Sequence, residues 1–388
     1  MRKATSALVG LLLAGVAATP AHADTVRSKQ WHLDAMKADD IWKTTTGKGV
    51  TVAVIDTGVG RIPELEGQVL PGKNFAQGSY PGDERTDYGN HGTTMAAIIA
   101  GNGKGPGGAE SAFGLAPGAK ILPLRIDRGG DGGPVFRSMI QAIRYAADSD
   151  AKVLNISIVG GSQSEELKQA VKYALDKGKL IFAGVGNDGA SDIYYPAATP
   201  GVVGVGAVDS EGAPTKESQH NESVDLAAPG MDIMTGCNGG TGLCKSHGTS
   251  DATALASASA ALLWSAHPDW TNNQVLRVLL NTAGKGDDGK ERNDYLGYGI
   301  VRPKVALPTP GDPGPKDVYP LPDLAAAEGK KSPAPSADAK NSASSVPQAE
   351  AKAEDKGSSL PWLALGLGAC VLVGGGAVTA VLVRRRSR

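Results

Sequence analysis

Short apolar runs alternate with amphipathic stretches through the middle of this 388-residue chain. Each run is four to eight residues long and rich in β-branched or small side chains, a pattern typical of strands buried on both faces of a parallel sheet. The runs that predict such strands are 50–55, 120–126, 151–158, 180–185 and 202–208.

Helical spacing of apolar residues fills the intervals between these predicted strands. Residues 137–148 have such a stripe, and the stretch after Glu165 and Glu166 has apolar residues at i, i+3, i+4, i+7 and i+8. Thr271 and Gln274 form a capping box at the start of another predicted helix. Residues 252–266 are almost all small or apolar, which predicts a helix buried on every side. The alternation indicates an α/β fold with a mostly parallel sheet covered by helices on both faces.

Four polar residues stand at the ends of these elements. Asp56 follows the first predicted strand, and His91 opens an Ala/Ile-rich helix. Asn187 lies in a glycine-rich turn after the strand at 180–185, and Ser250 follows Gly248-Thr249 just before the buried helix. Taken alone, each is explained by a helix cap or a turn. His247, three residues before Ser250, is the alternative to His91 as a catalytic base.

These residue types together suit acyl transfer. A serine in the first turn of a buried helix lies beside unpaired N–H groups and the positive end of the helix dipole, which favours a developing alkoxide. The chain order Asp56, His91, Ser250 matches one known order of a Ser-His-Asp triad. The side chain of Asn187 can donate an N–H to an oxyanion.

Both ends of the chain have features of membrane targeting or anchoring. Residues 1–23 have a basic start, an apolar core and an Ala-His-Ala cleavage site, which predicts a secretory signal peptide. Residues 360–383 are 24 residues without a charge, enough for a transmembrane helix, and 384–388 form a basic tail that should stay in the cytoplasm. We therefore expect a single-pass protein of the cell membrane with its body outside. A wall-anchoring signal is the alternative, but no Leu-Pro-x-Thr-Gly motif precedes the apolar run.

Between these ends we expect three segments. Residues 24–48 predict a short helix-bearing arm laid on the surface, 49–307 the folded domain, and 308–359 a disordered stalk rich in Pro, Ala and Ser. Cys237 and Cys244 are close enough to form a disulfide in an oxidising compartment, where they would steady the turn before Ser250.

Composition narrows the remaining function classes. The net charge of −1, with acidic and basic residues mixed, gives no nucleic-acid patch. We found no phosphate-binding glycine loop, we expect no cofactor or catalytic metal, and no Asp/Asn loop is convincingly spaced for structural calcium.

Four blocks around these residues resemble the signature blocks of the subtilisin-like serine peptidases: 54–58, 90–93, 186–189 and 248–250. The resemblance implies that Ser250 attacks a peptide carbonyl, His91 transfers the proton, Asp56 orients the imidazole and Asn187 stabilises the oxyanion. It also implies that Ser157, Ile158, Val159 and Gly160 bind substrate. Two residues depart from the family pattern. The family usually has Met or Phe directly after the nucleophile, where this chain has Asp251, and glycine where this chain has Val159.

The signal peptide, short arm, stalk, span and basic tail together resemble the mycosins, membrane-anchored subtilisin-like peptidases associated with type VII secretion. This implies a protein or peptide substrate and a secretion membrane complex as partner. The alternative is a structural subunit that stabilises such a complex, with weak or dispensable protease activity.

Overall fold

The computed structural model describes residues 25–77, 80–128, 133–160, 162–239, 242–286, 289–327 and 329. Their centre is a seven-stranded parallel sheet with the order β2-β5-β1-β6-β7-β8-β9. Its strands are β1 (Thr51–Asp56), β2 (Lys73–Asn74), β5 (Lys120–Arg125), β6 (Val153–Ile156), β7 (Leu180–Gly184), β8 (Val203–Val208) and β9 (Leu226–Pro229). The predicted α/β class and the five predicted strands are confirmed.

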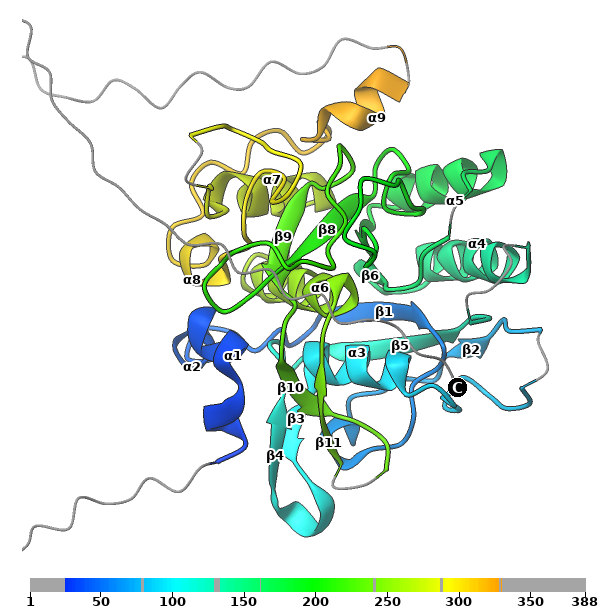
Figure 1. The fold of residues 1–388 in the computed structure, drawn as a ribbon, viewed down its shortest axis with the longest axis vertical. Coiled ribbons are helices and arrows are strands. Elements are labelled where there is room, and N and C mark those ends of the chain that lie inside the picture. Colours follow the sequence, from blue (N-terminus) through cyan, green and yellow to red (C-terminus); the bar gives the residue numbers. More distant parts are fainter. Residues whose placement is uncertain are drawn as a thin grey trace, which may run out of the picture. The chain divides into compact units, whose positions relative to one another are not determined.

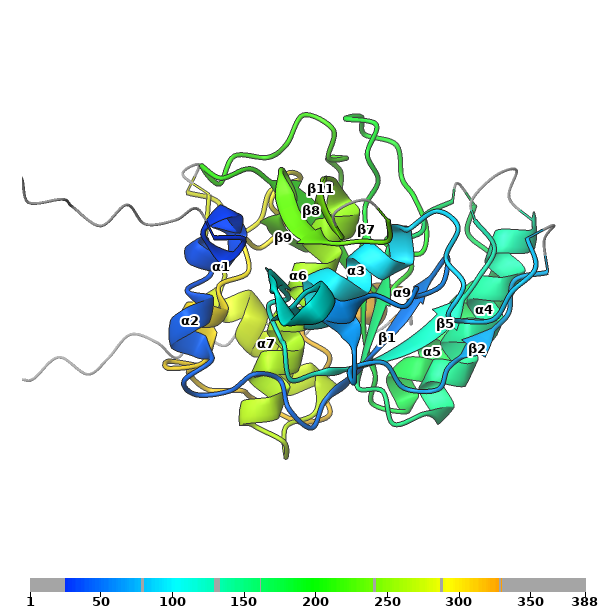
Figure 2. The same ribbon diagram turned by 90° about the horizontal axis from the view of Figure 1, so that it is seen from below.

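Helices cover both faces of this sheet (Figure 2). One face packs against α3 (His91–Ala100), α6 (Thr249–Ala266) and α7 (Asn272–Thr282), and the other against α4 (Gly133–Asp148) and α5 (Glu165–Asp176). Because successive strand side chains point to opposite faces, Val52 and Val54 of β1 enter the first core, whereas Ala53 and Ile55 enter the second.

Helix α6 runs through the centre of the domain (Figure 1), and residues 249–264 are all buried. Its alanines and serines allow close approach to the sheet, and its hydroxyl groups are satisfied within the core. Thr253 and Ser259 donate to the carbonyls of Thr249 and Leu255, and Ser257 donates to Asn155. The predicted all-round burial is confirmed, and the helix begins three residues before the expected start at 252.

The N-terminal arm forms short helices, and one face of it is buried against the rest of the domain. It contains a 3₁₀ turn (Arg27–Lys29) and helices α1 (Trp31–Ala35) and α2 (Ala38–Ile41). Gln30 and Leu33 are fully buried. The Gln30 side chain donates to the carbonyls of Phe113 and Met234 at 2.7 and 3.1 Å and accepts from the Phe113 N–H at 3.1 Å.

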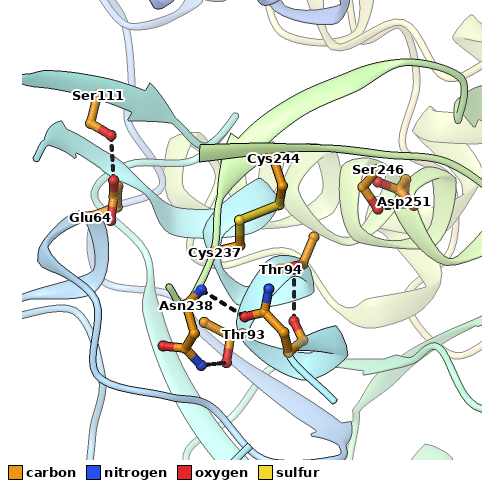
Figure 3. Close-up of a disulfide and its surroundings, with 10 residues drawn as sticks. Glu64, Thr93, Thr94, Ser111, Cys237, Asn238, Cys244, Ser246 and Asp251 are labelled. Atoms are coloured by element: carbon orange, nitrogen blue, oxygen red, sulfur yellow. Dashed lines mark hydrogen bonds between the residues drawn. A yellow bond between two sulfur atoms is a disulfide. The ribbon is translucent and has the colours of Figure 1, made fainter. Parts of the chain in front are cut away.

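Two hairpins lie side by side next to this arm: β3 (Asn102–Lys104) with β4 (Glu110–Phe113), and β10 (Ile233–Gly236) with β11 (Leu243–Ser246) (Figure 1). The predicted disulfide between Cys237 and Cys244 is confirmed and joins the residue after β10 to β11 (Figure 3). Two further 3₁₀ turns span Pro63–Leu65 and Pro106–Gly108.

The chain beyond the sheet continues through α8 (Pro303–Ala306) to α9 (Pro322–Ala327). The first part of the stretch predicted as a stalk packs on the domain: the Arg277 guanidinium donates to the carbonyls of Pro313 and Val318, and Leu321 is buried. Most of the predicted stalk, the signal peptide, the span and the basic tail lie outside the described residues. Within the described ranges, no helix combines the length and apolarity needed to cross a bilayer.

Candidate active site

Asp56 and His91 are in contact at the carboxyl edge of the sheet. Asp56 ends β1 and is buried, and His91 opens α3 with one third of its side chain exposed. The Nδ1 atom of His91 lies 2.8 Å from Oδ1 of Asp56. Gly92 makes this contact possible, because a Cβ there would lie 2.2 Å from the Gly58 carbonyl oxygen. The helix can therefore begin directly against the end of the strand.

Ser250 lies in the first turn of α6 and packs against the end of β6. Its Oγ donates to the carbonyl of Ser157 at 3.3 Å, and the Ser157 hydroxyl donates to the Ser250 carbonyl at 3.2 Å. The turn before it needs glycine, since Gly248 has a φ of 119°. Among the described residues, no hydrogen bond joins Ser250 to His91. In serine hydrolases such a bond often tightens only when substrate is bound.

The register of the sheet places the Asp56–His91 pair and the Ser157–Ser250 pair at the same edge of the sheet. Ile55 of β1 is paired with Ile156 of β6, so the next residues, Asp56 and Ser157, leave the sheet at the same level. Adjacent strands are about 4.8 Å apart. Asp56 contacts His91 and Ser157 contacts Ser250. The predicted carboxylate, imidazole and hydroxyl thus share one edge of the sheet.

Asn187 follows β7 at this same edge. Its Oδ1 accepts the Thr249 N–H at 2.8 Å, which ties it to the turn that carries Ser250. The residue is exposed, and its amide N–H groups have no protein partner among the described residues. This leaves a hydrogen-bond donor beside the turn that carries Ser250, where the oxyanion prediction needs one.

The four predicted substrate-binding residues are in different settings. Ser157 is buried against Ser250, while Ile158 and Val159 are partly exposed. Gly160 pairs through both its N–H and its carbonyl with the backbone of Tyr195 at 2.9 and 2.8 Å. The substrate-binding role of residues 157–160 stays a prediction.

Asp87 is a further residue of the site that sequence reasoning missed. Its carboxylate accepts from the hydroxyl of Thr57 at 2.8 Å and from the N–H and hydroxyl of Thr93 at 2.9 and 2.6 Å. It therefore joins Thr57, the residue after β1, to the first turn of α3, the two segments that carry Asp56 and His91. The available signal was an acidic residue just before a helix start, where it satisfies free N–H groups.

Charges near His91 favour its protonated form. Burial opposes the imidazolium, but the carboxylates of Asp56, Asp251 and Asp87 outweigh this and raise the pKa of His91 to about 9. Asp251 is fully buried, and desolvation raises the pKa of its carboxyl to about 7 although Ser246, His91 and His247 act in the opposite direction.

His247 is engaged elsewhere. Its exposed ring lies with Nδ1 2.9 Å from the Glu217 carboxylate, whose hydrogen bond raises the pKa of the imidazole. The contact with Asp56 belongs to His91, so the geometry favours His91 over His247 as the base.

The sequence matches the model of the subtilase family, peptidase S8, over residues 47–299. It is 36% identical over 262 residues to subtilisin BL of Lederbergia lenta, covering 67% of this chain and 91% of that protein. It is 37% identical over 250 residues to the thermophilic serine proteinase of Bacillus sp. strain AK1, covering 64% of this chain and 60% of that one.

Solved structures of mycosins have the same fold. MycP1 from Mycobacterium smegmatis superposes with a TM-score of 0.63 at 29% identity, covering 74% of this chain and 86% of that one. MycP3, described as a protease from the type VII (ESX-3) secretion system, gives 0.62 at 31% identity, covering 71% and 87%. The match to the family model over most of the folded domain, with this fold, shows that the chain belongs to the subtilase family of serine peptidases.

Proposed function

We propose that the protein is a membrane-anchored, extracytoplasmic serine endopeptidase in which Asp56, His91 and Ser250 form the catalytic triad. The observation that carries this proposal is the 2.8 Å contact between His91 Nδ1 and Asp56 Oδ1 at the sheet edge that also holds Ser250. Family membership supplies the reaction class, and the geometry supports these three residues as its machinery.

In the proposed mechanism, Ser250 Oγ attacks the carbonyl carbon of the scissile peptide bond while its proton passes to Nε2 of His91. Asp56 holds the Nδ1–H of His91 and so presents Nε2 to the hydroxyl. His91 then gives the proton to the leaving amine, and an acyl-enzyme remains on Ser250. A water molecule, activated by His91, hydrolyses this ester and restores the hydroxyl.

The oxyanion of the tetrahedral intermediate is assigned to two donors. One is the side-chain amide of Asn187, which is tied to the Thr249 N–H through its oxygen. The other is the backbone N–H of Ser250, in the first turn of α6, where intrahelical partners are lacking. Two fixed donors can stabilise the developing charge without reorganisation.

The anchor and the secretion partner belong to the same proposal. They are supported by the uncharged stretch 360–383 with its basic tail, and by the likeness to a protease from a type VII secretion system. A chain ending at residue 359 is expected to leave the membrane fraction and appear in the medium. Retention of this shortened chain in the membrane fraction would contradict the anchor. Cross-linking of the full chain in its own membranes should capture components of a secretion complex, and capture of none would contradict the partner.

The triad is tested by labelling the full chain with a fluorophosphonate, which reacts with an activated serine. The intact protein should be labelled, and Ser250→Ala should lose the label. Ser259→Ala is the matched control, because it removes another buried hydroxyl of α6 that bonds only to the preceding turn. No labelling of the folded protein would refute the proposal and favour the scaffold alternative.

A further inference from the structure

Asp251, the residue after Ser250, has a buried carboxyl group of which only one oxygen is hydrogen-bonded among the described residues. It lies in the first turn of α6 and has no solvent exposure. Its Oδ2 accepts from the Ser246 hydroxyl at 3.0 Å, on the side where β11 enters the turn (Figure 3). Its Oδ1 is buried and has no hydrogen-bond partner in the part of the chain that the structure describes. Burying a carboxylate is costly unless a positive charge compensates it.

The compensating charges are imidazoles. Helix α3, which begins at His91, packs against α6, and His247 lies between β11 and α6; the positive charges of both imidazoles lower the pKa of the Asp251 carboxyl. Each has its own carboxylate: Asp56 on His91 and Glu217 on His247. The remaining charged groups that act on these imidazoles are Asp87, before α3, and Asp232, which pairs with Lys245 on β11.

We propose that Asp251 is a positioning residue for the peptidase reaction, whose carboxylate stabilises the protonated imidazole of His91 alongside Asp56. The inference rests on the proposed triad. Where Asp56 holds Nδ1, Asp251 acts through space from the helix that carries the nucleophile. The negative charge of Asp251 therefore stabilises the imidazolium that forms when His91 accepts the proton of Ser250.

One electrostatic interaction acts on the pKa values of both groups. The negative charge of Asp251 raises the pKa of His91, and the positive charge of His91 lowers the pKa of Asp251 against the effect of burial. In the transition state His91 is an imidazolium, and in the resting enzyme it is an imidazolium only below its pKa. Asp251 should thus leave the rate unchanged at low pH and increase it at high pH, where the resting imidazole is neutral.

The experiment measures the second-order rate constant for fluorophosphonate labelling of the full chain between about pH 6 and pH 10. In Asp251→Asn, the pH at which the rate reaches half of its alkaline plateau should fall by about one unit. The alkaline plateau should fall by the same factor, about tenfold, while the rates at the acid end coincide with those of the unaltered protein. A general structural defect would instead lower the rate by one factor at every pH.

Glu64→Gln is the matched control, because Glu64 is also fully buried and accepts from the Ser111 hydroxyl, but its charge is not among those that raise the pKa of His91. Its profile should follow that of the unaltered protein. Asp251→Ala provides a second neutral side chain if the asparagine variant fails to fold, and the same shift is expected. If a folded Asp251 variant has the same pH–rate profile as the unaltered protein, or a higher rate at the alkaline plateau, this inference is overturned and the proposed function is not. Absence of Ser250-dependent labelling at every pH overturns the proposed function with it.

Discussion

His32 offers a test of whether the N-terminal arm is a structural part of the domain. It lies in α1, is 1% exposed, and its Nδ1 has no hydrogen-bond partner among the described residues. Trp31 packs edge-on against the ring, with 6.3 Å between centroids. Burial, with a smaller contribution from the charge of Arg27, lowers the pKa of His32 from 6.5 to about 3. The folded protein therefore holds this imidazole neutral.

The consequence is a loss of stability in acid. Because the unfolded chain binds a proton at His32 below pH 6.5 and the folded chain does so only near pH 3, stability falls as pH falls through this interval. Each pH unit costs about 1.4 kcal/mol, so the contribution of His32 declines by about 2 kcal/mol between pH 7 and pH 5. Above pH 6.5 the residue has almost no effect on the pH dependence.

The test compares two proteins, one with histidine and one with leucine at position 32. Both have the Ser250→Ala substitution, which prevents self-cleavage. Urea unfolding followed by tryptophan fluorescence gives the free energy of unfolding at each pH. Other titrating groups, including His91 and Asp251, are present in both proteins and cancel in the difference. The histidine protein should lose about 2 kcal/mol more than the leucine variant between pH 7 and pH 5. Parallel pH dependences would refute the reasoning and show that the arm exposes His32 to water.

Two further predictions concern the arm and the oxyanion. Gln30→Leu should reduce the free energy of unfolding by about 3 kcal/mol, because it leaves backbone groups of Phe113 and Met234 unpaired. Denaturant midpoints measure this change. A loss below about 1 kcal/mol would show that these hydrogen bonds are not needed for stability. Asn187→Ala should lower kcat by about 10²- to 10³-fold with little change in KM. An unchanged kcat in peptide hydrolysis would exclude Asn187 as an oxyanion donor.

The candidate site could be proposed from sequence because its residues mark the ends of regular elements. Asp56 follows a buried strand, and His91 and Ser250 begin buried helices. Carboxyl ends of parallel strands meet at one edge of a sheet, so a correct assignment of strands and helices already gathers these side chains. Asp87 lay outside this logic because it belongs to an irregular loop, and only the fold shows that it reaches both Thr57 and Thr93.

The sequence by itself determined the periodic elements, their parallel arrangement and the order of the candidate catalytic residues, because apolar spacing and turn residues act over a few positions along the chain. Only the tertiary structure decided the contacts made across long separations. It placed Gln30 in the core against Phe113 and Met234, 83 and 204 positions away, and it placed Ser250 against Ser157, 93 positions away. Such contacts depend on how packed layers meet, which no local pattern of polar and apolar residues encodes.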